Sequence, residues 1–600
     1  MDDRPTPHLI ELFDNQVDRF PDETALIVDG ARISYRELRD RARTLAAQLV
    51  GAGVNPGDTV ACRMAGRADT LAAALAALAA GAAYAAMDPA MPEYRIGQML
   101  ANLQPAVILA DGESTTSGAA TVVNPPAPGA EPATEWPDGW RQVDGDSTFH
   151  IVYTSGTTGT SRGVLIPHRA VINRLQWMWE TYPFQSGDTA VWHKSAALVA
   201  SPWEMFGALL QGVPTLAVEH ETVLDPQALW RTLTEVGATH FLAAPALLAG
   251  LAEEAAADPA RPCRLRFLST SAESISPELV HTLHARFPRA VVVNMYGLSE
   301  CASNVTVYDT AALAPSASKV PIGRPISGCS VLVVDGRLRP VPIGVEGEML
   351  VSGACLATGY LGEDELTAKR FITVDPGDGQ TVRMYRTGDR ARLLPSGALE
   401  YAGRTDDQVQ VRGFRVELGD VQAALELHPE VSKAVVRSVS GADGTELTAF
   451  LEGDSVDLAD VRAFMQQTVP QFMLPSRYLV LQRIPLTASG KVDMAALDEL
   501  ESGPATADEE AHVAPRTATE EMIAGVWTKA LRRESVGVHD VFFDIGGQSL
   551  MAARIMSQLR GSFGLALPIR LLFDHPTVAE LAAIVDQRLH EELKSMQSGG

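Results

Sequence analysis

A loop of small, hydroxylated and glycine residues follows a short apolar run and limits what this chain can fold into. Residues 154–163 read TSGTTGTSRG, and the run before them, HIVY at 150–153, has the pattern of a buried strand. Glycines let the main chain approach a phosphate, while N–H and hydroxyl groups donate to its oxygens. No Gly-Lys-Ser/Thr follows, so this is not a P-loop. An ordinary surface loop is the alternative, but the strand in front favours phosphate binding, with Arg162 as a nearby positive charge.

Composition and charge exclude several function classes. The chain has 600 residues and a net charge of −25 without a basic stretch, which argues against nucleic-acid binding. Its five cysteines lack CxxC or Cys/His ligand spacing, which is typical of a reduced cytoplasmic enzyme without a metal–thiolate site. The N-terminal residues lack a signal-peptide pattern, and no apolar stretch reaches the length of a membrane span. We therefore expect a cytoplasmic, multidomain enzyme that binds neither nucleic acid nor membrane.

The patterning changes twice along the chain. Helical and strand patterns alternate up to about residue 400, which is typical of a layered α/β architecture. Residues 501–515, ESGPATADEEAHVAP, are acidic and nearly free of apolar side chains, so they are predicted to be a linker. From Thr517 onward the pattern is helical again.

Further motifs follow the loop in a fixed order. They are LVASPWEMF at 198–206, VNMYGLSE at 293–300, GEMLVSG at 347–353, TGY at 358–360, YRTGD at 385–389, GRTDDQV at 403–409, ELG at 417–419 and PLTASGKVD at 485–493. This series resembles the adenylate-forming superfamily, which joins carboxylic acids to AMP, and within it the adenylation domains of nonribosomal peptide synthetases. The resemblance covers about residues 10–498. It departs from the family where Ser161-Arg162 replace Pro-Lys, and where Val199 replaces the Asp of members that activate amino acids.

The C-terminal helical region resembles a peptidyl carrier domain. The sequence GGQSL at 546–550 opens a predicted helix, and a terminal helix is predicted from about Pro576 to Leu593. In that family the serine carries 4′-phosphopantetheine, which implies that Ser549 is the attachment site. A helix N-cap is the ordinary alternative role for such a serine. Gly546 and Gly547 would leave room for a modifying enzyme.

The resemblance implies a large layered α/β adenylation core, a small mobile α+β subdomain and a four-helix carrier domain. The predicted boundaries are 1–404 for the core, 405–498 for the subdomain, 499–515 for the linker and 516–594 for the carrier domain.

The resemblance also implies a nucleotide site. Glu300 corresponds to a Mg²⁺ ligand, although a solvated loop acid is its ordinary alternative. Tyr296 would stack on adenine, and Asp389 would accept hydrogen bonds from the ribose hydroxyls beside Arg404. The predicted nucleotide-binding residues are Thr154, Ser155, Gly156, Thr157, Thr158, Gly159, Arg162, Asn294, Tyr296, Gly297, Ser299, Asp389 and Arg404.

Two residues of the small subdomain would take part in catalysis. Lys491 is the predicted catalytic lysine, which would bridge the bound carboxylate and the phosphate and neutralise the charge that develops as the acid attacks. Lys491 must then leave before a thiol can attack, so the subdomain would rotate about a hinge at Asp406. A capping role for Asp406 is compatible with the hinge.

The substrate pocket is carried over from the same resemblance. A buried ammonium needs a partner of opposite charge, and Val199 cannot provide one. We therefore predict an acid without a free α-amino group: an α-keto, α-hydroxy, aryl, acyl or N-blocked acid, or a β-amino acid bound elsewhere. An amino acid whose ammonium pairs with another group, such as Glu204, is the alternative. The predicted lining, whose small polar members favour a polar tail, is Val199, Ala200, Trp203, Ala246, Ser269, Ser271, Met295, Ser303 and Asn304, with Lys491.

The predicted function is ATP-dependent formation of an acyl-AMP and acyl transfer to the phosphopantetheine thiol on Ser549, as a loading unit in nonribosomal peptide or hybrid antibiotic biosynthesis. The implied cofactors are ATP, Mg²⁺ and 4′-phosphopantetheine. The implied partners are the acid, a phosphopantetheinyl transferase and a downstream condensation or tailoring enzyme, and the resemblance leaves room for a small MbtH-like activator protein. No HHxxxDG condensation signature is present, so the acyl group would pass to another protein. An acyl-CoA ligase and a non-catalytic carrier protein are the alternative functions.

Overall fold

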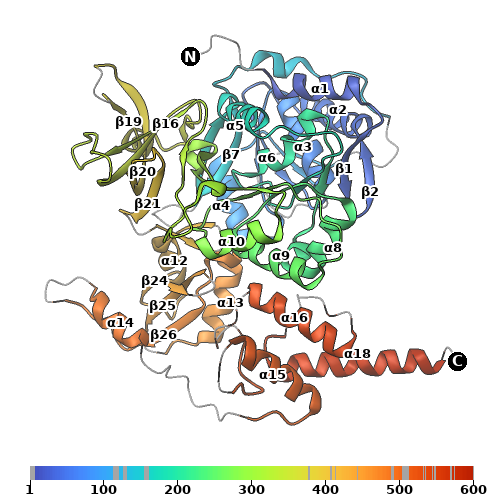
Figure 1. Ribbon diagram of the computed structural model, residues 1–600, viewed down its shortest axis with the longest axis vertical. Coiled ribbons are helices and arrows are strands. Elements are labelled where there is room, and N and C mark those ends of the chain that lie inside the picture. The colour runs from blue at the N-terminus through green and yellow to red at the C-terminus, as the bar shows by residue number, and fades with distance from the viewer. Residues whose placement is uncertain are drawn as a thin grey trace. The chain divides into compact units, whose positions relative to one another are not determined.

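A computed structural model gives the fold. It describes residues 7–111, 121–125, 131–154, 161–375, 379–405, 408–411, 414–441, 444–453, 455–487, 492–502, 513–531, 533, 535–542, 545, 547, 549–565, 567, 571–572 and 575–598. The chain divides into two compact units, one of residues 1–218, 232–420 and 466–472, the other of residues 219–231, 421–465 and 473–600. The elements are labelled in chain order in Figure 1. The predicted domain boundaries at 404, 498 and 515 remain predictions.

The largest sheet of the first unit has nine strands in the order β15-β14-β13-β12-β11-β9-β10-β1-β2. The strands from β13 to β1 are parallel to their neighbours, and β2, β14 and β15 add antiparallel pairs at the two edges. Because the carboxyl ends of parallel strands meet at one edge, segments far apart in the sequence are brought together there. The bounds are β1 Thr24–Val28, β2 Ala31–Ser34, β9 Ala190–Trp192, β10 Thr215–Ala217, β11 His240–Leu242, β12 Phe267–Thr270, β13 Val291–Leu298, β14 Ser303–Asp309 and β15 Arg324–Pro325.

A second sheet of this unit has seven strands in the order β18-β8-β7-β4-β3-β5-β6. Strands β7 and β8 are antiparallel, with Thr154 opposite Arg162, so they are the two arms of the predicted phosphate loop. Residues 155–160 of that loop lie outside the described residues. The bounds are β3 Thr59–Arg63, β4 Ala83–Ala86, β5 Val107–Ala110, β6 Thr121–Val123, β7 Thr148–Thr154, β8 Arg162–Pro167 and β18 Gly359–Tyr360.

Two antiparallel sheets complete the first unit. A five-stranded sheet has the order β16-β17-β20-β19, with β21 paired to β20, and β22 pairs with β23 in a separate hairpin. The bounds are β16 Cys329–Val334, β17 Glu346–Gly353, β19 Phe371–Val374, β20 Val382–Leu393, β21 Leu399–Arg404, β22 Gln408–Val411 and β23 Phe414–Glu417.

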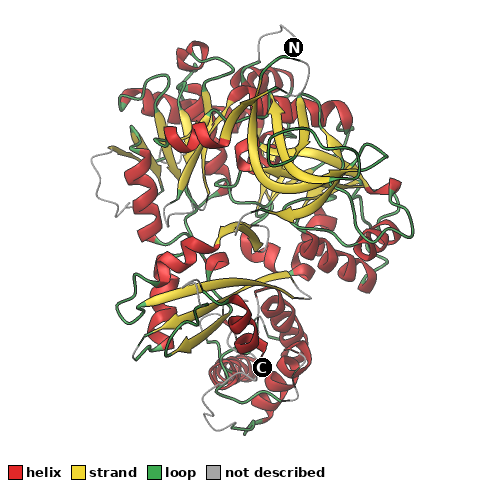
Figure 2. Cartoon of the chain, turned by 90° about the vertical axis from the view of Figure 1, so that its left-hand side faces the viewer, coloured by secondary structure: helices red, strands yellow, loops and turns green. Residues whose placement is uncertain are grey.

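Helices, red in Figure 2, lie beside the yellow strands of the sheets. Several of them bury apolar side chains, such as Leu38, Leu45 and Leu49 of α2. Helix α2 begins with a capping box, in which Ser34 accepts from the Glu37 N–H and Glu37 accepts from the Ser34 N–H. The helix bounds in this part of the chain are α1 Leu9–Arg19, α2 Tyr35–Gly51, α3 Arg67–Ala79, α4 Glu93–Leu103, α5 His168–Thr181, α6 Ser201–Phe206, α8 Pro226–Val236, α9 Pro245–Ala257, α10 Pro277–Arg286 and α11 Asp364–Arg370, with 3₁₀ turns η1 Asp138–Gln142, η2 Leu209–Gln211, η3 Ser299–Cys301 and η4 Thr310–Ala312. Helix α7 His220–Leu224 and the first residues of α8 belong to the second unit.

The second unit contains a small α+β part and a helical C-terminal part. In the α+β part, β24 and β25 are antiparallel and β26 is parallel to β25. In the helical part, the Trp527 ring packs against Phe542 at 4.9 Å between ring centroids. From residue 418 onward the element bounds are α12 Leu418–Leu425, β24 Lys433–Gly441, β25 Gly444–Glu452, α13 Leu458–Thr468, η5 Gln471–Met473, β26 Arg477–Leu481, α14 Met494–Ser502, α15 Ala518–Leu531, α16 Ser549–Phe563 and α18 Val578–Ser598. The start of α12, the end of α13 and most of η5 belong to the first unit.

The predicted fold class, an α/β adenylation fold followed by a helical carrier region, is confirmed. The terminal helix begins and ends a few residues later than predicted, because its polar last turns carry no apolar periodicity that would mark an end. Among the helices of the described residues, none combines the length and the apolarity that a membrane crossing requires.

Candidate active site

Several predicted nucleotide-binding residues lie close together on β13 and on the 3₁₀ turn η3 that follows it. Asn294, Tyr296 and Gly297 lie on this strand, and Ser299 and Glu300 begin η3. The Asn294 amide donates to the carbonyl oxygen of Pro321 at 2.9 Å. A Cβ at Gly297 would lie 1.4 Å from the carbonyl oxygen of the facing strand, so only glycine allows β13 and β14 to approach this closely.

Asp389 is buried on β20 and contacts two of the other predicted nucleotide-binding residues. The Tyr296 hydroxyl donates to one carboxylate oxygen, and the guanidinium of Arg404, directly opposite on β21, donates to the other. Burial raises the pKa of Asp389, although the Arg404 charge acts in the opposite direction. Side chains from three strands, β13, β20 and β21, therefore meet at this carboxylate.

Glu300 is buried rather than solvated, with 3% of its surface exposed. The Arg415 guanidinium donates to its Oε2 at 3.0 Å, and the Tyr360 hydroxyl donates to its Oε1 at 2.8 Å. Burial acts to raise the pKa of Glu300, but Arg415 and these hydrogen bonds hold it below its usual value. Glu300 is therefore an ionised carboxylate at neutral pH.

Glu300 fits a metal ion only as its single protein ligand. Within the described residues, no group of three or more His, Cys, Asp or Glu side chains could hold a metal ion. One protein carboxylate suits Mg²⁺ that takes its other ligands from nucleotide phosphates and water. Arg415 would have to release Glu300 for that contact.

Of the remaining predicted nucleotide-binding and catalytic residues, the structure describes only some. Arg162 lies 3.4 Å from the Glu363 carboxylate, in an ion pair at the start of β8. The predicted loop residues 155–159, the hinge residue Asp406 and the catalytic lysine Lys491 lie outside the described residues.

The predicted acid pocket lies at the carboxyl edge of the nine-stranded sheet. Val199, Ala200, Trp203 and Ser303 line a small cavity, together with Arg174. A second cavity, which Trp203 also lines, is bordered by Ser269 and Glu204. Ala246 and Ser271 line neither of these two cavities.

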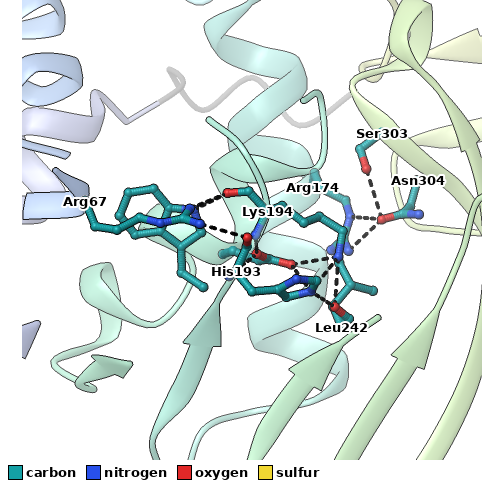
Figure 3. Close-up of polar contacts among 9 residues, drawn as sticks. Arg67, Arg174, His193, Lys194, Leu242, Ser303 and Asn304 are labelled. Atoms are coloured by element: carbon teal, nitrogen blue, oxygen red, sulfur yellow. Dashed lines mark hydrogen bonds and ion pairs between the residues drawn. The ribbon is translucent and has the colours of Figure 1, made fainter. Parts of the chain in front are cut away.

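Glu204 is already paired and is not an available partner for a substrate ammonium. Its Oε1 accepts from Lys194 Nζ at 2.9 Å, and its Oε2 accepts from the backbone N–H groups of His193 and Lys194, each at 2.9 Å. The Lys194 ammonium also donates to the carbonyl oxygen of Leu242 at 2.8 Å (Figure 3). Burial acts to raise the pKa of Glu204, but Lys194 holds it below its usual value. Burial lowers the pKa of His193 to about 4, so this ring is neutral at pH 7.

Arg174 is a candidate pocket residue that the sequence motifs do not indicate. Its Nε and Nη2 donate to Asn304 Oδ1 at 3.2 and 2.9 Å, and Figure 3 shows it pointing from α5 toward Asn304. Its sequence signal is a charged residue on the buried face of α5, where Val171, Leu175 and Met178 continue the i, i+4, i+7 spacing. That signal marks burial and does not identify a ligand.

The helical C-terminal part places Ser549 at the first residue of α16. The preceding Gly547 N–H donates to the carbonyl oxygen of Phe542 at 2.8 Å. A Cβ at Gly547 would lie 2.4 Å from the Phe542 ring, so a side chain here would push the turn away from the core.

Two protein families match this chain. The AMP-binding enzyme family matches residues 13–361, and the phosphopantetheine attachment site family matches residues 522–585. The chain therefore belongs to the AMP-binding enzymes: it is an adenylate-forming ligase, and it carries a fused phosphopantetheine carrier domain as nonribosomal peptide synthetases do. The predicted family is thereby confirmed.

The curated relatives are longer synthetases. The chain is 35% identical to the dimodular nonribosomal peptide synthase of Bacillus subtilis, over 96% of this chain and 25% of that protein. It is also 36% identical to phosphinothricin tripeptide synthetase PhsB of Streptomyces viridochromogenes, over 96% of this chain and 49% of that protein. The chain thus spans less than half of each of these two relatives.

Solved structures share the whole architecture. Holo-PA1221, a nonribosomal peptide synthetase protein with adenylation and carrier domains, superposes with a TM-score of 0.80 at 24% identity, over 96% of each chain. At this identity the likeness shows the fold alone. Holo-AB3403, a four-domain synthetase bound to AMP and glycine, has a TM-score of 0.59 at 28% identity, over 97% of this chain and 43% of that one.

Proposed function

We propose that this chain activates a carboxylic acid that lacks a free α-amino group and transfers the acyl group to a phosphopantetheine thiol on its own Ser549. The carboxylate oxygen attacks the α-phosphorus of ATP, the bond to pyrophosphate breaks, and an acyl-AMP forms. The thiolate then attacks the acyl carbon, a thioester forms and AMP leaves. The acid would be a keto, hydroxy, aryl or N-blocked acid.

One observation carries the choice of acid. Arg174 is among the residues that line the cavity beside Val199, and none of those lining residues is acidic. A substrate ammonium there would be desolvated beside a like charge, which costs several kcal/mol. Because Glu204 is bound to Lys194, it does not offer a second place for the ammonium.

In the proposed mechanism, three side chains of this chain act in the formation of the acyl-AMP. Asp389 would bind the ribose, Tyr296 would lie against the base, and Lys491 would neutralise the charge between carboxylate and phosphate. Bound Mg²⁺ would neutralise the departing pyrophosphate, with Glu300 as its protein ligand. A downstream condensation or tailoring enzyme would accept the thioester, after a phosphopantetheinyl transferase has modified Ser549.

A pyrophosphate-exchange panel tests the class of acid. We expect 2-oxo and 2-hydroxy acids to exceed the 2-amino acid with the same side chain at least about tenfold in kcat/KM, because the ammonium is unpaired. Isotope exchange from pyrophosphate into ATP measures each acid. The Val199→Asp variant serves as the matched control and should shift the preference toward the amino acid. A wild-type preference for the free amino acid would overturn this part of the proposal.

Glu300→Gln tests the proposed metal ligand. The variant keeps the size of the side chain but removes the charge, so we expect exchange to fall about 100-fold and to need more Mg²⁺. A Mg²⁺ titration of the exchange rate measures both effects. Glu346→Gln, which breaks an exposed pair with Arg390, is the control and should leave the Mg²⁺ dependence unchanged. Equal Mg²⁺ dependence in wild type and Glu300→Gln would contradict the assignment.

A further inference from the structure

We infer that Arg174 selects acids whose tail carries a second anionic group, so that the substrate is a small dicarboxylic acid or an acid with an equivalent anionic tail. The inference rests on the proposed function and narrows it, because it names the group that occupies the pocket cavity in place of an ammonium.

Arg174 is a buried cation without a counter-ion among the described residues. It is 5% exposed and lines the first cavity. Its Nη1 has no hydrogen-bond partner, and no ion pair joins Arg174 to any carboxylate in the described part of the chain. A buried, unpaired guanidinium is costly in isolation, so it is retained where a ligand supplies the missing charge.

The neighbours of Arg174 hold it in place but do not neutralise it. Asn304 Oδ1 accepts from two of its nitrogens and from Ser303 Oγ, which is 3.2 Å away. The rings of Trp177 and Trp203 lie 5.0 and 5.3 Å from its guanidinium carbon. Burial lowers the pKa of Arg174 to about 9, so the group remains protonated at neutral pH. The guanidinium is therefore held by Nε and Nη2, while its Nη1 is buried without an acceptor.

Lys194, a second cation near the predicted acid pocket, differs from Arg174 because its charge is neutralised. The ammonium of Lys194 is paired with Glu204 at 2.9 Å, whereas Arg174 has only neutral acceptors. The first cavity therefore carries a net positive charge. Guanidinium binds carboxylate through parallel N–H···O bonds, a geometry that ammonium cannot offer.

The anion that Arg174 binds would be distinct from the reacting carboxylate. The reacting group must lie against the α-phosphate of the nucleotide, whereas Arg174 belongs to the pocket that holds the rest of the acid. A neutral amide or ketone could also accept one hydrogen bond from Nη1. A charge-assisted bond is stronger, and only an anion removes the unpaired charge.

Two ladders of probe acids test the inference on the full-length holo protein. One compares succinate, succinamate and butyrate, and the other compares glutarate, glutaramate and pentanoate. We expect the dicarboxylate to exceed its monoamide about 10- to 100-fold in kcat/KM for pyrophosphate exchange in at least one ladder. In Arg174→Gln this ratio should fall to about one, while Arg169→Gln, a paired arginine on the same helix, should retain it.

Folding is checked separately with Arg174→Met. Because this variant replaces an unpaired buried charge with an apolar chain of similar length, its Tm should equal or exceed that of wild type. The inference is overturned by a monoamide that matches the dicarboxylate, by a ratio that survives Arg174→Gln, or by dicarboxylates that give no exchange in either ladder. Exchange with neutral keto or hydroxy acids would leave the proposed function standing in each of these cases. Preference for an α-amino acid, including glutamate or aspartate, would instead refute the proposed function itself.

Discussion

Ser549→Ala is expected to abolish covalent loading of the carrier domain and to leave acyl-AMP formation unchanged. The hydroxyl of Ser549 is the only atom of this side chain that can form the phosphodiester with phosphopantetheine, so no partial activity should remain. Intact-protein mass spectrometry, after treatment with a phosphopantetheinyl transferase and then with acid and ATP, measures both modification and thioester. Pyrophosphate exchange, which needs only the adenylation site, should proceed at the wild-type rate.

Ser562→Ala is the matched control for this experiment. Ser562 lies on the same helix, α16, and is exposed, so its variant should be modified and loaded as the wild type is. Phosphopantetheine on the Ser549→Ala protein would disprove the attachment site. Equally fast thioester formation on free coenzyme A by both proteins would favour the acyl-CoA ligase alternative. Absence of exchange with every acid would favour a non-catalytic carrier.

Lys491→Ala is expected to lower pyrophosphate exchange about 10²- to 10³-fold. Lys491 is proposed to place a positive charge between the attacking carboxylate and the α-phosphate, and the loss of one such interaction commonly costs this much. The second step does not need the lysine. Transfer from a chemically prepared acyl-AMP to the carrier thiol should therefore be retained in the variant.

The comparison of the two half-reactions separates catalysis from folding. A misfolded variant would lose both steps, whereas the loss of Lys491 should affect the first alone. Lys433→Ala, on β24 of the same α+β part, is the control and should retain both steps. Undiminished exchange in Lys491→Ala would refute the proposed catalytic role.

Much of the fold was predictable because its signals are local. The short apolar run at 150–153 predicts a buried strand, which is part of β7, and the small and glycine residues after it predict a loop. The need for glycine at position 297, by contrast, is visible only in the structure, where the facing strand excludes any Cβ. The exact ends of helices were less predictable, as α18 shows, because helix termini depend on tertiary packing.

The predicted site residues were identified by motif, and Arg404 was expected beside Asp389, but the charge partner of Glu300 was not identified. Glu300 pairs with Arg415, which lies 115 residues further along the chain. Arg174 binds Asn304, which is 130 residues away. Neither pairing has a sequence signal, because each arises where separate strands and helices pack together. The sequence left Glu204 as an alternative partner for a substrate ammonium, and the structure shows that Glu204 is already paired with Lys194.

The sequence by itself determined the class of reaction and the two-part organisation, because phosphate loops, strand ends and a carrier serine depend on residue types at short spacing. Only the tertiary structure decided which charges are neutralised within the pocket and which remain open to a ligand. Electrostatic pairing depends on distances of a few ångströms between side chains that the chain separates by a hundred residues or more. The unpaired guanidinium of Arg174 therefore emerges from the fold alone.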